Sequence, residues 1–77
     1  MLRPATCRAA RGLLDWSQAD LAERAGVSRS TVKDFECGRH DLHAATEGHL
    51  LEALEAAGIR LVRDEQAEGV MRRVEQG

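Results

Sequence analysis

Residues 18–38 decide the fold, and they read QADLAERAGVSRSTVKDFECG. Apolar residues at helical spacing lie on both sides of Gly26, and Ser17 and Ser28 stand where two short helices would begin. A glycine directly after a helix can take the left-handed backbone conformation that ends it. The pattern predicts helices over 18–25 and 29–37. The turn between them is so short that they must cross steeply rather than lie antiparallel.

The second of these helices has two distinct faces when each residue advances by about 100° around its axis. With Val32 pointing inward, Phe35 and Glu36 also face the interior. Polar side chains that can contact base edges gather on the opposite face. This outer face consists of Ser30, Lys33, Asp34 and Cys37, flanked at the N-terminal end by Arg29 and Thr31.

The segments on either side predict two more helices. A helix over 4–14 begins at Pro4, which suits a first helical turn, and Asp15-Trp16 breaks it. Its apolar stripe is Ala9, Ala10, Leu13 and Leu14. A fourth helix is expected to be capped by Thr46 and to end at Gly58. Its apolar face is Leu50, Leu51, Leu54 and Ala57.

The C-terminal segment fits two patterns. Residues 59–63 alternate in part and are rich in β-forming side chains, which predicts a strand, and residues 69–74 could return as a second strand. The spacing of Ala67, Val70, Met71 and Val74 also fits a helix. Periodicity alone leaves both open.

Length and composition limit the class of protein. The 77 residues form one small domain, which excludes most large single-domain enzyme folds. No apolar stretch is long enough for a membrane helix, and two cysteines favour free thiols in the reducing cytoplasm. Residues 1–40 carry seven basic and five acidic side chains, a net of +2, whereas residues 41–77 carry four and eight, a net of −4. Any contact with phosphate is therefore expected in the first half.

No catalytic residues, metal site or cofactor are predicted. Cys37, His40 and His43 have a spacing that invites a zinc site, but no second thiol pair lies nearby and a helix end running into a loop suits tetrahedral ligands poorly. No nucleophile-bearing turn lies near the histidines. Trp16, the only tryptophan, is expected to pack in the core rather than stack on a base.

The segment from Ala9 to Ile59 resembles the helix-turn-helix of the lambda-repressor/Cro-like (XRE) family of DNA-binding proteins. The resemblance rests on residues 18–38, on the preceding Leu14-Asp15-Trp16-Ser17 and on the following Gly38-Arg39. It implies a mainly α fold of four helices. Several small relatives end in a β-hairpin at a pattern like Ala57-Gly58-Ile59 and a later Gly69-Val70, so the resemblance favours a C-terminal hairpin. Many relatives have a proline where Leu42-His43 stands here, which leaves that loop open.

The resemblance also implies roles for individual residues. Five residues of the 29–37 helix would read base edges in the major groove: Arg29, Ser30, Thr31, Lys33 and Asp34. Four others would hold phosphates: Ser17, Gln18, Ser28 and Arg39. Two of these assignments have alternatives, since Asp34 could instead pair with Lys33 or Arg39, and Arg39 could pair with Glu36.

Residues 1–58 are therefore interpreted as a helix-turn-helix DNA-binding domain, and residues 59–77 as a β-hairpin or dimerisation tail. The expected function is a sequence-specific transcriptional regulator, a dimeric repressor that binds double-stranded DNA as a homodimer through its tail. The alternative is a protein-interaction module, such as an antitoxin or anti-regulator, which would use the same fold and its acidic second half to hold a protein partner.

Overall fold

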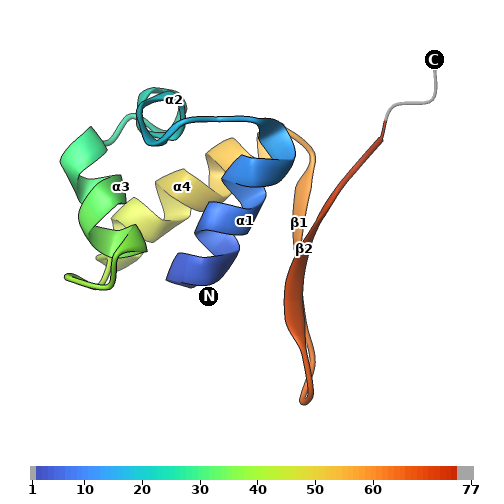
Figure 1. Cartoon of the computed structure of the whole chain (residues 1–77). Helices are drawn as coiled ribbons and strands as arrows, with labels where there is room; N and C mark the ends of the chain where they lie inside the picture. Colours follow the sequence, from blue (N-terminus) through green and yellow to red (C-terminus); the bar gives the residue numbers. More distant parts are fainter. Residues whose placement is uncertain (1, 75–77) are drawn as a thin grey trace.

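The computed structural model describes residues 2–74 of the chain. Four helices are followed by two strands: α1 (Pro4–Leu14), α2 (Gln18–Ala25), α3 (Arg29–Glu36), α4 (Ala44–Ala56), β1 (Ile59–Arg63) and β2 (Glu68–Arg72). The strands form an antiparallel hairpin, so the tail is a hairpin and not a helix. In Figure 1, α1 and α4 lie between α3 on one side and the hairpin on the other.

The predicted stop signals are confirmed. Gly26, Gly38 and Gly58 all have a positive φ, and each lies just past the end of a helix. Ser17 and Ser28 both cap their helices, because each hydroxyl accepts a hydrogen bond from the backbone N–H three residues on. These local signals fix where α2 and α3 begin and end.

The core is built from all four helices and the first strand. Its fully or nearly fully buried apolar residues are Leu2, Cys7, Ala10, Leu21, Ala22, Val32, Phe35, Leu50, Leu54 and Ile59. The predicted apolar face of α4 is confirmed by the burial of Leu50 and Leu54. No helix among residues 2–74 has the length and apolarity needed to cross a membrane.

Two sequence predictions about the helices were wrong. The helix α4 begins at Ala44 and not after Thr46, and the residue at its cap, His43, makes no side-chain capping bond. A tertiary contact lies at this end, where the backbone N–H of Leu2 donates to Oε2 of Glu47 at 2.8 Å. On α1, Ala9 and Leu13 are exposed while Cys7 is fully buried, so the buried stripe is rotated toward Cys7 and Ala10.

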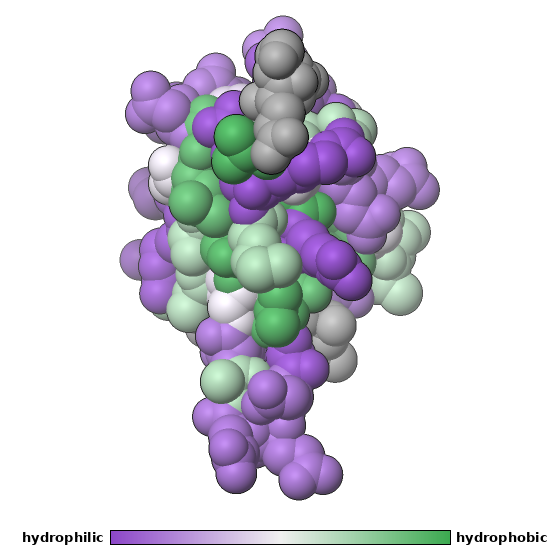
Figure 2. Space-filling view, turned by 90° about the vertical axis from the view of Figure 1, so that its right-hand side faces the viewer, coloured by the Kyte–Doolittle hydropathy of each residue, from purple (hydrophilic) through white to green (hydrophobic). Residues whose placement is uncertain are grey.

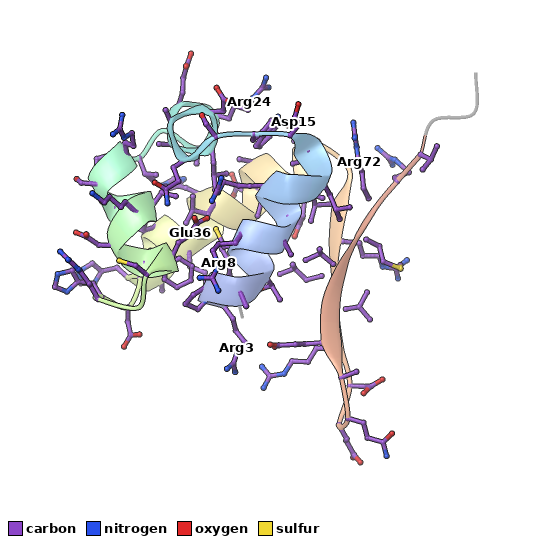
Figure 3. The ribbon with its side chains drawn as sticks, viewed as in Figure 1. Arg3, Arg8, Asp15, Arg24, Glu36 and Arg72 are labelled. Carbon is purple, nitrogen blue, oxygen red and sulfur yellow. The ribbon has the colours of Figure 1, made fainter. Side chains whose placement is uncertain are left out.

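The hairpin is fastened to α1 at both of its ends. Near its tip, Nε of Arg3 lies 3.4 Å from Oε2 of Glu68. At its base, Nη1 of Arg72 donates to the carbonyl oxygen of Leu13 at 3.0 Å, and Figure 3 shows Arg72 on the hairpin near the end of α1. Ile59 is buried in the core beneath the hairpin. The hairpin is therefore docked on the helical domain.

Candidate nucleic-acid interface

The turn between α2 and α3 sets the angle at which the two helices meet. Gly26 has a φ of 70°, and the N–H of the next residue, Val27, donates to the carbonyl of Ala22 at 3.0 Å. This hydrogen bond caps the C-terminus of α2 and reverses the direction of the chain there. Ala22, whose carbonyl accepts this bond, is buried, so a larger side chain there would displace its neighbours in the core.

The helix α3 is divided into a buried and an exposed face, as predicted. Val32, Phe35 and Glu36 are buried. Arg29, Ser30 and Lys33 are exposed, while Thr31 and Asp34 are half-buried. The side chains predicted to read bases therefore all reach the surface in part or in full, on one short helix.

Three hydroxyl groups cluster at the N-terminus of α3. Oγ of Ser28 accepts from the N–H of Thr31 at 3.1 Å, and it also lies 2.6 Å from Oγ1 of Thr31 and 3.3 Å from Oγ of Ser30. A hydroxyl can donate once and accept more than once. The cluster therefore holds the first turn of α3 in place while keeping polar groups at the surface.

The buried side of α3 is organised around the carboxylate of Glu36, which is only 3% exposed. Arg11 on α1 donates to both carboxylate oxygens, from Nε at 2.8 Å and from Nη2 at 2.7 Å. Sγ of Cys7 donates at 3.0 Å and Nε2 of Gln18 donates at 3.0 Å. Figure 3 shows Glu36 between α1 and α3, with Arg8 close by. Arg8 donates in turn to the backbone carbonyl of Glu36.

Burial and hydrogen bonding shift the pKa of Glu36 in opposite directions. Burial would raise the pKa of Glu36, but the hydrogen bonds from Arg11, Cys7 and Gln18 outweigh it and leave that pKa below the ordinary value. The Cys7 thiol has a raised pKa, first because it is buried and second because it donates to Glu36. The carboxylate is therefore charged and the thiol protonated at neutral pH.

This cluster was only partly foreseen. The helical wheel placed Glu36 inside, and one alternative for Arg39 was to pair with it. That alternative was wrong, because Glu36 is paired with Arg11 while Arg39 is exposed. A buried carboxylate needs a cation, and that requirement indicates that an arginine must lie beside Glu36 without selecting Arg11 among several.

The N-terminus of α2 carries the residues predicted to hold phosphate. One N–H of the Gln18 amide is used by Glu36, which leaves the second N–H and the carbonyl oxygen. Ser17 is exposed, and its backbone N–H donates to Oδ2 of Asp20 at 2.9 Å. Hydrogen bonds from Ser17, first from its backbone and then from its side chain, lower the pKa of Asp20. An ionised carboxylate thus lies beside the expected phosphate contacts, which the sequence analysis did not weigh.

Asp34 and Arg39 do not pair with each other through their side chains. Within residues 2–74 the ion pairs are Arg3–Glu68 and Arg11–Glu36, so the alternative in which Asp34 pairs with Lys33 or Arg39 is not realised. The backbone N–H of Arg39 donates to the carbonyl of Asp34 at 2.9 Å, which sets the chain direction after α3. Both charged side chains remain available for outside contacts.

The sequence also singled out Trp16 and a possible zinc site at Cys37, His40 and His43. Trp16 is half-buried against the core, as expected, and the guanidinium of Arg24 lies 4.5 Å from the centre of its ring. His40 and His43 are exposed, as is Cys37. Over the described part of the chain, no three side chains of the metal-binding types come together.

Two short helices joined by a tight glycine turn, with one polar surface on the second, define a helix-turn-helix protein. In a comparison with family models, the one described as helix-turn-helix matches residues 8–61, which is most of the chain. The protein therefore belongs to the XRE/lambda-repressor-like helix-turn-helix family, a family of DNA-binding transcription regulators. A comparison with curated proteins gave no significant match.

Proposed function

We propose that this protein is a sequence-specific transcriptional repressor of the cytoplasm that places α3 in the major groove and acts as a homodimer through its C-terminal hairpin. The observation that carries the proposal is the outer surface of α3. Cationic and hydroxyl side chains at Arg29, Ser30 and Lys33 are exposed there, directly opposite residues that are fixed in the core.

The chemistry of this surface suits base reading. Arg29 and Lys33 can donate to O6 and N7 of guanine, while Asp34 can accept from N4 of cytosine. Ser30 and Thr31 can do either. Asp34 would be repelled by phosphate, so a carboxylate at this place supports contact with bases more than contact with the backbone of DNA.

Phosphate contacts would flank this surface and set the position of the helix without choosing the sequence. Ser17 and Gln18 offer donors at the start of α2, and Ser28 offers one at the start of α3. Arg39 supplies a free cation just past the end of α3. These four residues stand beside the five that would read bases.

The test begins with selection of bound sites from random DNA at a stated salt concentration, since the phosphate contribution depends steeply on salt. On the selected site, Arg29→Ala is expected to weaken binding by about 1–3 kcal/mol and to relax the preference at one base pair. Arg29→Lys is the matched control, because it keeps the charge but loses the bidentate geometry. It should relax the preference while leaving the salt dependence nearly unchanged. Equal losses on every sequence would contradict base reading by Arg29.

The second candidate function is that of a protein-interaction module, favoured by the net charge of −4 in residues 41–77. A gel shift by the purified chain on its own upstream region supports the regulator. Co-purification of an untagged neighbouring protein, without any shift by the chain alone, supports the module.

A further inference from the structure

Gly69 is the second residue of β2, opposite Val62, and no contact within the described residues requires a glycine there. Its φ is not positive, and a Cβ atom added to it would meet nothing within 4 Å. The two strands pair residue by residue on both sides of Gly69, without a bulge. Glycine weakens a strand, and in a strand interior it often marks a place where another backbone or a ligand comes close. The space above Gly69 is therefore open for a second surface.

Side chains alternate across the hairpin, so its two faces can be assigned. Ile59 is buried, and Leu61 and Val70 are half-buried against the core, so this face is the inner one. The residues between them face away from the helices, and we call them the outer hairpin face: Arg60, Val62, Gly69 and Met71. Val62 is 41% exposed and Met71 is 52% exposed. Figure 2 views this side of the molecule, where apolar side chains run down the middle toward a hydrophilic tip.

We propose that a second copy of this chain docks on the outer hairpin face, with the two hairpins antiparallel. Met71 of each chain then lies over Gly69 of the partner subunit. Met71 and Gly69 are two residues apart on the same face of one strand. A two-fold axis that lies between the two faces and passes over Val70 exchanges their positions, so each flexible methionine fills the space above a glycine. This inference rests on the proposed function, and it specifies how the dimer would form.

The charges along the hairpin favour the antiparallel arrangement. Asp64 and Glu65 are exposed at the tip, whereas Arg72 and Arg73 are exposed toward the base. The antiparallel dimer sets the acidic tip of one subunit over the basic base of the other. A parallel dimer would set acid over acid and base over base, which is unfavourable. Glu68 and Arg72 are engaged within the chain, through Arg3–Glu68 and through the bond of Arg72 to Leu13. The exposed Arg63 offsets one of the two acidic charges at the tip, so the tip keeps a net negative charge.

The placement of the hairpin is compatible with DNA binding. In Figure 1 the hairpin and α3 lie on opposite sides of α1 and α4, so a partner on the outer hairpin face leaves α3 uncovered. Half-sites of two-fold regulators are about 34 Å apart, which requires each recognition helix to lie about 17 Å from the axis. One chain measures 36 × 31 × 19 Å, so such a distance fits within it.

The decisive experiment is sedimentation of the full chain over a range of concentrations, with the variant Gly69→Val. Valine favours strands and its Cβ meets open space, so the melting temperature of the variant should not fall at concentrations where the original chain is monomeric. A side chain at this position would, however, hold the two faces apart, and the dissociation constant of the dimer should rise about tenfold or more. Gly48→Ala on α4 is the matched control, because its Cβ also meets open space and it should leave the dimer unchanged.

A charge exchange tests the orientation independently. Arg73→Glu and Glu65→Arg should each weaken the dimer, and the double variant should recover much of the loss. A Gly69→Val protein that dimerises as strongly as the original chain would overturn the proposal and would point to pairing through the strand edges instead. An original chain that stays monomeric at all concentrations would overturn it as well. Binding of Gly69→Val to a single half-site at low salt is measured separately. If the original chain dimerises yet binds no DNA, the proposed function fails while this inference stands.

Discussion

Replacing Glu36 by glutamine is expected to remove about 3 kcal/mol from the free energy of unfolding at neutral pH. Glutamine has nearly the same shape, so the change tests charge and hydrogen bonding rather than packing. A domain of this size has a total stability of about 4–12 kcal/mol. The loss would therefore be a large part of the whole, and unfolding should be measured well below the melting temperature.

The magnitude follows from the contacts of the carboxylate. Glu36 accepts two hydrogen bonds from Arg11, one from Cys7 and one from Gln18. The glutamine amide has only one oxygen that can accept hydrogen bonds. Its NH₂ group would face an N–H donor of Arg11, and neither donor would have an acceptor. Breaking a buried ion pair from one side costs about 3–5 kcal/mol. We expect the lower end, because the Arg11 side chain is 18% exposed and water can solvate part of its charge.

The same contacts make this loss depend on pH. The pKa of Glu36 in the folded chain lies below its ordinary value of 4.5, so the folded state binds the proton less readily than the unfolded state. Its contribution to stability is thus full above about pH 5 and is lost as the pH falls through the lower, folded pKa. The stability difference between the original chain and Glu36→Gln should shrink in that acidic range.

Urea unfolding of both proteins at several pH values between neutral and strongly acidic measures this difference directly. A double-mutant cycle with Arg11→Met supplies the control, since Glu36→Gln should cost much less once the arginine is gone. A stability difference that stays constant down to the lowest pH would refute the reasoning. So would a cycle in which the two substitutions are simply additive.

Two further predictions concern the helix-turn-helix itself. Asp20→Asn should strengthen DNA binding on all sequences alike, because it removes a carboxylate beside the expected phosphate contacts. A gel shift should show the largest gain in affinity at low salt. A gain in affinity on one sequence alone would contradict this. Gly26→Ala should lower the free energy of unfolding by about 1–2 kcal/mol in urea titrations, because alanine is strained at a φ of 70°. The control Gly12→Ala, which lies within α1 and has open space at Cβ, should instead leave stability unchanged or raise it.

Much of the fold could be predicted because its signals are local. A serine that caps a helix and a glycine that ends it act on their own neighbours, so the bounds of α2 and α3 follow from a few adjacent residues. The two faces of α3 follow from helical geometry once Val32 is placed inside. The hairpin was not decided by periodicity, since residues 67–74 fit both a strand and a helix. There the likeness to known relatives favoured the right alternative.

The errors lie where distant residues determine the outcome. The first turn of α4 carries a bond between Leu2 and Glu47, which are 45 residues apart. The buried stripe of α1 turns toward Cys7 because the helix must also bring Arg11 to Glu36, 25 residues away. Local propensity carries no information about either contact. The sequence could place Glu36 inside the molecule, but it could not select its cation among several arginines.

Gln18 lies between the buried cluster around Glu36 and the surface that is expected to contact DNA. Its amide donates to the buried carboxylate that α1 and α3 share, yet it lies at the N-terminus of α2, next to exposed Ser17. Its free N–H and carbonyl oxygen are therefore oriented by the core. If a phosphate binds there, the direction of that contact is set by Glu36, and the position of α3 in the groove is set by the same carboxylate. A charge buried inside a small domain thus links the groups that would touch the backbone of DNA to those that would touch the bases, a role that an apolar pair of similar volume could not take, although such a pair could stabilise the fold as well.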